Sequence, residues 1–178
     1  MYYLRHGQSV ANVKNLFAGQ KDNSPLTEKG IEQAREAGKG LAHVNFSKII
    51  SSPLDRAVET ARTVAEVVGF EGQISVDPRI TEYDMGVLTS QPREGVDSSM
   101  LTSAQGAEDP VLFKNRVIEF LQEISDLESD ILLVSHAGVG RVIETSRQGI
   151  DPSRLYDVDA YPNAEPVVLN LEWLDSSE

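Results

Sequence analysis

Two histidines and two arginines give this sequence its clearest chemical potential. Arg5 and His6 are adjacent near the start of the chain, while Arg56 and His136 lie far from them in sequence. A neutral imidazole is a good nucleophile near pH 7, because its unperturbed pKa is about 6.5. An arginine presents forked donors that match the oxygens of a phosphate, whereas a lysine offers only a point charge. These residue types suit phosphoryl transfer, provided that the fold brings them together.

The hydrophobic pattern predicts the elements that would position these side chains. Short apolar runs bounded by polar residues indicate buried strands, and apolar positions at helical spacing indicate amphipathic helices. Thr27 is a candidate N-cap, and Ser52-Pro53 looks like an N-cap followed by a first helical residue. The expected strands are residues 1–4, 48–51, 74–76, 131–134 and 167–174, and the expected helices are 28–41, 53–68, 110–124 and 139–148.

Alternation of strands with helices predicts an α/β fold, namely a three-layer α/β/α sandwich with a mostly parallel central sheet. Ligands of such sheets usually bind beyond the carboxyl ends of the strands. Arg5 and His6 follow the first expected strand, Arg56 follows the second, and His136 follows the apolar run before it. We therefore expect the four side chains to meet at one edge of the sheet.

Composition bounds the kind of protein. The chain has 178 residues, with 28 acidic residues against 16 lysines and arginines, and no cysteine. The length suits one domain over residues 1–178, and the lack of cysteine excludes disulfides, thiolate metal sites and a thiol nucleophile. A net charge of −12 disfavours nucleic-acid and anionic-membrane partners, which are bound through basic patches. A small anionic ligand in a local cationic pocket remains compatible with it.

Targeting features point to a cytoplasmic protein. The first expected strand occupies the place of a secretory signal, and no apolar run approaches the roughly 20 residues of a membrane-spanning helix. We also expect no metal, because no pair of histidines has local chelating spacing and the cluster is cationic. His43, near the end of the helix 28–41, is expected to be structural.

Three motifs carry a resemblance to a known family. They are Leu4-Arg5-His6-Gly7, the segment from Ser52 to Ala61 that includes Arg56, and Ser135-His136-Ala137-Gly138. In order and spacing, over nearly the whole chain, they resemble the signatures of the histidine phosphatase superfamily, also called phosphoglycerate mutase-like. The resemblance implies that fold and a cofactor-independent reaction on a small phosphorylated substrate, with His6 as the nucleophile that forms a phosphohistidine. It also implies that Arg5, Arg56 and His136 bind the phosphoryl group.

A leaving alkoxide must be protonated, and the resemblance assigns this role to Glu82, which precedes Gly86 by four residues. Asp84 and Glu108 are alternative acids nearby. The acid-phosphatase branch carries an aspartate directly after its second histidine, where this chain has Ala137, so Glu82 is favoured. The resemblance also suggests Asn12, and less strongly Gln8, as ligand contacts, while backbone NH groups around Ala137 could contribute further donors.

The segment of about residues 83–109 corresponds to the lid of similar proteins, and it departs from the family pattern after Gly86. Its shortness and acidity favour a phosphatase, which admits water, over a mutase, which must retain the phosphorylated intermediate. Three functions therefore stay open: a phosphomonoesterase acting on small monoesters, a phosphoglycerate-type mutase, and a catalytically quiet phosphate-binding module.

Overall fold

Five short strands form one sheet in the computed structural model, which describes residues 1–125, 127 and 129–176. Their order in the sheet is β3-β2-β4-β1-β5. β5 runs antiparallel to β1, and the other neighbouring pairs are parallel. The strands are β1 (Tyr2–Arg5), β2 (Lys48–Ser51), β3 (Ser75–Val76), β4 (Ile131–Ser135) and β5 (Pro166–Val168).

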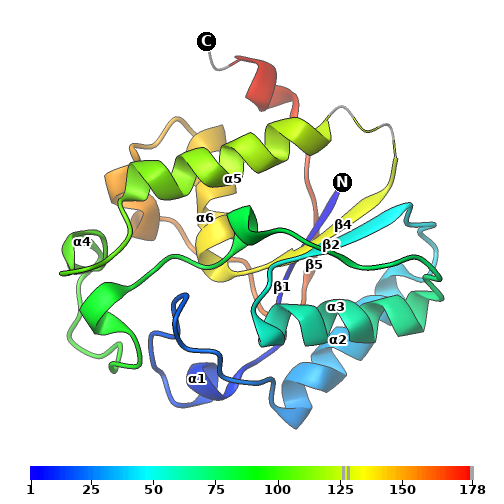
Figure 1. Cartoon of the computed structure of the whole chain (residues 1–178), viewed down its shortest axis with the longest axis horizontal. Helices are drawn as coiled ribbons and strands as arrows, with labels where there is room; N and C mark the ends of the chain where they lie inside the picture. Colours follow the sequence, from blue (N-terminus) through cyan, green and yellow to red (C-terminus); the bar gives the residue numbers. More distant parts are fainter. Residues whose placement is uncertain (126, 128, 177–178) are drawn as a thin grey trace.

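Helices cover both faces of this sheet (Figure 1). α2 (Glu28–Leu41) and α3 (Asp55–Val68) lie on one face, and α5 (Pro110–Ser125) and α6 (Ala137–Arg147) lie on the other. The prediction of a three-layer sandwich with a mostly parallel sheet is confirmed. The shorter elements are the helices α1 (Val10–Val13) and α4 (Ser98–Ser103) and the 3-10 helices Pro78–Ile80, Gly86–Leu88, Pro152–Asp157 and Glu172–Ser176.

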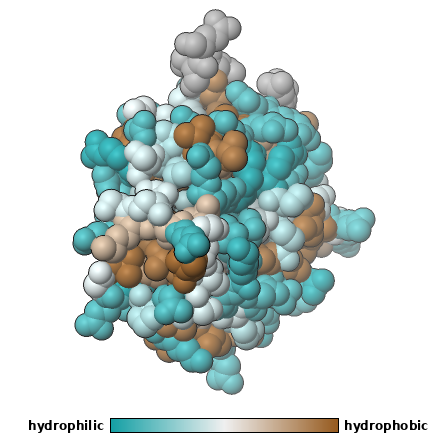
Figure 2. Space-filling view, turned by 60° about the vertical axis from the view of Figure 1, so that its left-hand side comes forward, coloured by the Kyte–Doolittle hydropathy of each residue, from teal (hydrophilic) through white to brown (hydrophobic). Residues whose placement is uncertain are grey.

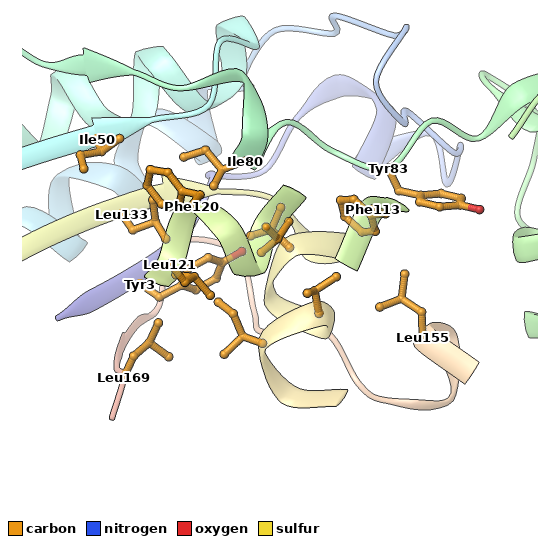
Figure 3. Packing of buried hydrophobic residues seen from close by; sticks show 14 of the residues in the cluster. Tyr3, Ile50, Ile80, Tyr83, Phe113, Phe120, Leu121, Leu133, Leu155 and Leu169 are labelled. Carbon is orange, nitrogen blue, oxygen red and sulfur yellow. The ribbon is translucent and has the colours of Figure 1, made fainter. Parts of the chain in front are cut away.

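Each face of the sheet has its own hydrophobic core, because successive side chains of a strand point to opposite faces. Tyr3 and Leu133 pack on the side of α5 and α6, where Figure 3 shows Phe120 of α5 beside them. Leu4 and Leu132 pack on the side of α2 and α3. The central strands are therefore apolar on both faces, which explains why they appear in the sequence as uninterrupted apolar runs.

Of two predicted helix starts, one is confirmed and one is wrong. Thr27 caps α2, because its hydroxyl accepts a hydrogen bond from the Gly30 backbone NH at 3.0 Å. The prediction that a helix begins at Pro53 with Ser52 as its cap is wrong: α3 begins at Asp55, and its N-cap is Leu54. The Ser52 hydroxyl accepts from the backbone NH of Leu54 at 3.4 Å, one residue before the helix, and lies 2.7 Å from the Nε2 of His136.

The predicted strand over 167–174 is also wrong in length, since β5 ends at Val168. The paired register with β1 ends at Tyr2 and Val168, and the Leu169 NH donates to the Met1 carbonyl just beyond it. Asn170 then turns the chain, because its side-chain oxygen accepts from the Glu172 NH at 2.9 Å. A 3-10 helix follows where the alternating pattern suggested a strand.

The segment 83–109, which the resemblance marks as a lid, contains α4 and one 3-10 helix. It lies against the loop around α1: Leu16 and Pro92 form an isolated bridge, and the Phe17 NH donates to the Gln91 carbonyl. The face of the molecule that carries α4 is largely hydrophilic, with separate hydrophobic patches (Figure 2).

Candidate active site

The sheet register brings the three motifs together at one edge. Arg5, at the end of β1, lies beside Ser135, at the end of β4, and Val134 of β4 lies beside Ser51 of β2. A cavity of about 270 Å³ opens beyond these strand ends. It is lined by Arg5, His6, Ser9, Asn12, Phe17, Ala18, Gly19, Arg56, Glu82, Met85, Arg93, Val96, Ser98, Leu101, Ala137, Gly138, Arg141 and Tyr156.

His6 presents an imidazole with a defined tautomer to this cavity. Its Nδ1 lies 2.7 Å from the Gly7 carbonyl oxygen, which can only accept, so Nδ1 carries the proton and Nε2 carries the lone pair. Burial lowers the pKa of His6 well below its usual value, and the charges of Arg56 and Arg5 lower it further. The side chain is therefore neutral at pH 7, as a nucleophile must be.

His136 lies behind His6 and is fully buried. The two ring centroids are 5.2 Å apart, and the Nε2 of His136 is 2.7 Å from the Ser52 hydroxyl. Its Nδ1 is buried and has no hydrogen-bond partner among the described residues. Burial lowers the pKa of His136 well below the usual value, with Arg56 and His6 adding to the effect. His136 does not line the cavity itself, although it lies beside His6 as predicted.

These two lowered pKa values predict an acid-sensitive fold. Unfolded histidines take up protons as the pH falls below about 6.5, whereas His6 and His136 in the folded state do so only at lower pH. The free energy of unfolding should therefore fall with decreasing pH, approaching about 1.4 kcal/mol per pH unit for each histidine. Urea unfolding between pH 7 and 5 in phosphate-free buffer measures this. The slope should drop by about half in His6→Asn, and a flat profile for the native protein would contradict the expectation.

Arg5 and Arg56 place unpaired positive charge at the cavity. Arg56 is almost fully buried and donates to the carbonyls of Asp22 and Gly19 at 2.7 and 2.9 Å. Arg5 donates to the Tyr161 carbonyl at 2.9 Å. The Nε of each arginine is buried without an acceptor among the described residues. A buried donor without an acceptor is costly, so these two NH groups suit an anion that supplies the missing acceptors.

Glu82 is the carboxylate among the residues that line the cavity. Its Oε1 accepts hydrogen bonds from the backbone NH groups of Tyr83 and Gly138, at 2.8 and 3.0 Å. The two alternative acids point elsewhere: Asp84 pairs with Lys21 at 2.8 Å, and Glu108 pairs with Arg116 at 2.7 Å. Of the three candidate acids, Glu82 is therefore the one that lines the same cavity as His6.

Gly138 lets Glu82 approach the start of α6, because a Cβ at this position would lie 2.1 Å from the Glu82 Oε1. The carboxylate is the end of a flexible side chain that Gly138→Ala should displace, and the buried Phe113 ring, 3.2 Å from the added Cβ, must also shift slightly. We expect kcat to fall about tenfold or more and the unfolding free energy to fall by about 1 to 3 kcal/mol. Steady-state kinetics and urea unfolding measure both.

Gly40→Ala is the matched control, since a Cβ there meets nothing within 4 Å. It should leave kcat unchanged. Equal losses of kcat in the two variants would show that Gly138 does not position Glu82.

Some of the remaining predicted ligand contacts line the cavity and others do not. Asn12 and Ala137 line the cavity, and the Asn12 Oδ1 also accepts from the Ser9 NH in the capping box of α1. Gln8 does not line the cavity; its side-chain oxygen accepts from the Thr27 hydroxyl at 3.0 Å instead. His43 is exposed just after the C-cap of α2, away from the site as expected.

Two residues that line the cavity were not singled out from the sequence, Arg93 and Arg141. Ser52 of the second motif contacts His136, and Gly138 of the third motif contacts Glu82. Arg141 could have been found, because it follows Ala137 by one helical turn and so shares its face of α6. Arg93 could not, because the segment that carries it has no periodic pattern.

Within the described part of the chain, no helix is long and apolar enough to cross a membrane. In the same residues, no group of three or more histidine, aspartate or glutamate side chains is placed to hold a metal ion.

Fold and site together define a phosphoglycerate mutase-like α/β protein with paired histidines and unpaired arginines at the carboxyl edge of its sheet. The chain belongs to the histidine phosphatase superfamily (branch 1), whose family model matches residues 1–173. The predicted family membership is thus confirmed.

Individual relatives agree with this assignment. A probable phosphoglycerate mutase GpmB of Enterobacter sp. (strain 638) is 42% identical over 88 residues, which are 49% of this chain and 40% of that protein. The match thus spans less than half of that relative's length. The structure of the alpha-ribazole phosphatase from Shigella flexneri is similar with a TM-score of 0.77 and 26% identity, covering 96% of this chain and 90% of that one. A mycobacterial glucosyl-3-phosphoglycerate phosphatase shares the fold, with a TM-score of 0.79 and 23% identity over 93% of this chain and 88% of that one.

Proposed function

We propose that the protein is a phosphomonoesterase that hydrolyses small phosphate monoesters through a phosphohistidine at His6. The observation that carries this proposal is the position of the His6 imidazole. Its Nε2 has a free lone pair at a cavity that is also lined by one carboxylate and by two arginines, Arg5 and Arg56, whose buried Nε groups lack acceptors among the described residues. A phosphoryl transfer needs these parts: a nucleophile, cations for the phosphoryl oxygens and an acid for the leaving group.

In the first step the His6 Nε2 attacks phosphorus and the ester P–O bond breaks. The NH groups of Arg5 and Arg56 that lack acceptors bind the equatorial oxygens, whose charge they offset in the transition state. Glu82, in its protonated form, donates a proton to the leaving oxygen, and the alcohol departs. The Nδ1 of His6 keeps its proton throughout and donates a hydrogen bond to the Gly7 carbonyl, so the ring stays oriented.

In the second step Glu82 is a carboxylate and accepts a proton from water, whose oxygen attacks phosphorus. The P–N bond breaks, the electron pair returns to the His6 Nε2, and inorganic phosphate leaves. The backbone NH groups of Tyr83 and Gly138 hold the Glu82 carboxylate in place for this step. Each proton that the reaction moves thus has a named donor and acceptor in the chain or in the substrates.

A phosphoglycerate-type mutase is the second candidate, since the relative from Enterobacter sp. is named a probable phosphoglycerate mutase. It would use the same first step and return the phosphoryl group to the reoriented product instead of to water. The quiet phosphate-binding module is less well supported, because Glu82 stands at the cavity with His6.

Release of inorganic phosphate from a panel of small monoesters, with trapping of the enzyme in alkali, tests the proposal. We expect turnover on at least one monoester and an acid-labile phosphoryl group that peptide mapping assigns to His6. Faster interconversion of monophosphoglycerates than phosphate release would favour the mutase. Tight phosphate binding without turnover on any substrate would favour the quiet module.

A further inference from the structure

Four arginines line the cavity, and none of them forms an ion pair with a carboxylate among the described residues. They are Arg5, Arg56, Arg93 and Arg141. Elsewhere in the described chain, ion pairs are made by Arg35, Arg79, Arg116, Arg147 and Arg154. In an acidic protein with a net charge of −12, four arginines without an ion pair thus share one cavity, whereas Arg62, which also has none among the described residues, lies outside it. One phosphoryl group engages two of them in the proposed reaction, which leaves Arg93 and Arg141.

Both of these arginines are anchored so that their outer nitrogens stay available. The Arg93 Nε donates to the Leu16 carbonyl at 3.0 Å, and its guanidinium lies 5.3 Å from the centre of the Phe17 ring. The Arg141 Nε donates to the Val158 carbonyl at 2.8 Å, and its guanidinium lies 5.1 Å from the Tyr156 ring centre. The terminal nitrogens of both have no hydrogen-bond partner among the described residues, so each is a pre-oriented fork.

The positive charges of Arg93 and Arg141 lie close enough to Arg5 to affect its pKa. Burial lowers the pKa of Arg5, and the nearby Arg141 and Arg93 lower it further. Arg93 is exposed and Arg141 is partly buried, whereas Arg56 is almost fully buried. The cavity therefore has a deep cationic end and a second cationic region closer to solvent.

Apolar side chains make up much of the remaining wall. Phe17, Met85 and Leu101 are buried residues of the hydrophobic core that line the cavity, and the partly buried Val96 joins them. The volume of about 270 Å³ suits a small molecule. A ligand held at both cationic regions would thus place an uncharged part against these side chains.

We propose that Arg93 and Arg141 form a second anion site, which selects small phosphate monoesters that carry another anionic group at the far end of an apolar portion. The inference rests on the proposed function. It adds a substrate class: the second anion is a carboxylate or a second phosphate, since both accept the forked NH groups of arginine.

The test compares three alkyl phosphates of equal chain length, ending in a carboxylate, in the uncharged amide or in a second phosphate. We expect the native protein to hydrolyse at least one of the two compounds that carry a second anionic group with a kcat/KM about tenfold or more above that of the amide. The carboxylate and bisphosphate arms tell which anion is preferred. Arg93→Gln and Arg141→Gln should each reduce this preference severalfold while changing kcat/KM for the amide much less.

Arg93→Lys keeps the positive charge and should retain part of the preference. Arg35→Gln is the matched control, because Arg35 is exposed on α2 and pairs with Glu32. It should leave the preference unchanged. Urea unfolding of each variant separates a local effect from loss of the fold.

Binding of non-hydrolysable phosphonates separates the two proposals. Calorimetry with the carboxylate-bearing phosphonate and with its amide reports the second anion site even in a protein that turns nothing over. Preferential binding of the charged phosphonate without hydrolysis would overturn the proposed phosphatase and support the second site. Equal affinity for the two phosphonates, with hydrolysis intact, would overturn the second site alone. Equal losses for charged and uncharged substrates in Arg93→Gln and Arg141→Gln would also overturn it.

Discussion

Replacement of His6 by alanine is expected to lower kcat/KM for every phosphate monoester by about a thousandfold or more. Alanine removes the Nε2 lone pair that the Gly7 carbonyl leaves free by binding Nδ1. Arg5 and Arg56 remain in place, so we expect affinity for inorganic phosphate to stay within about tenfold of the native value. Steady-state kinetics and calorimetric titration measure the two quantities on the same preparation.

His43→Ala is the control for this experiment, because His43 is exposed and lies after the C-cap of α2. Its turnover should match that of the native protein. Undiminished turnover in His6→Ala would contradict the phosphohistidine mechanism. Loss of both turnover and phosphate binding, with an altered unfolding transition, would instead point to damage of the fold, and His6→Asn then repeats the test with a polar side chain of similar size.

Replacement of Glu82 by glutamine should have the next largest effect, a fall of about a hundredfold or more in turnover of an alkyl phosphate. Glutamine can accept the NH groups of Tyr83 and Gly138 through its oxygen, so the backbone around it should stay in place. It can neither protonate a leaving alkoxide nor take a proton from water. Both steps of the proposed reaction should therefore slow down.

The leaving group separates these two steps. Nitrophenolate departs without a proton, so Glu82→Gln should still release it rapidly, in a burst of about one equivalent per site, before the slow hydrolysis of the phosphohistidine. Stopped-flow absorbance and alkaline trapping measure the burst and the phosphoenzyme. Asp84→Asn is the matched control, since Asp84 pairs with Lys21 outside the cavity. A leaving-group dependence in Asp84→Asn rather than in Glu82→Gln would assign the acid to Asp84.

Much of the fold was predictable because the central strands are buried on both faces. Their apolar runs stand out from an otherwise polar chain, and β1, β2 and β4 agree with the prediction within one residue at each end. Since parallel strands share a carboxyl edge, the residues that follow them had to meet there, as Arg5, Arg56 and His6 do.

The cavity walls were harder to predict, because they depend on contacts between segments without a periodic pattern. Arg93 reaches the cavity because its loop is bound to the residues after α1, and nothing in the local sequence specifies that contact. Gly138 was visible only as part of a motif, whereas its role depends on the distance to Glu82. The end of β5 could not be predicted, because an alternating pattern does not reveal where pairing with the neighbouring strand stops.

The place of β1 in the sheet has a consequence for how the protein is made. β1 is translated well before its neighbours in the sheet, β4 and β5, where Leu4 pairs with Val134 and Pro166. Pairs so distant in sequence form slowly, because a long loop must close before the contacts that stabilise it exist. Arg5 and His6 are thus translated before β4 and α6, and their pocket is completed only after those elements have been synthesised. Until then the apolar residues of β1 lack the partners that cover them in the folded sheet, and such transiently exposed apolar surface favours aggregation.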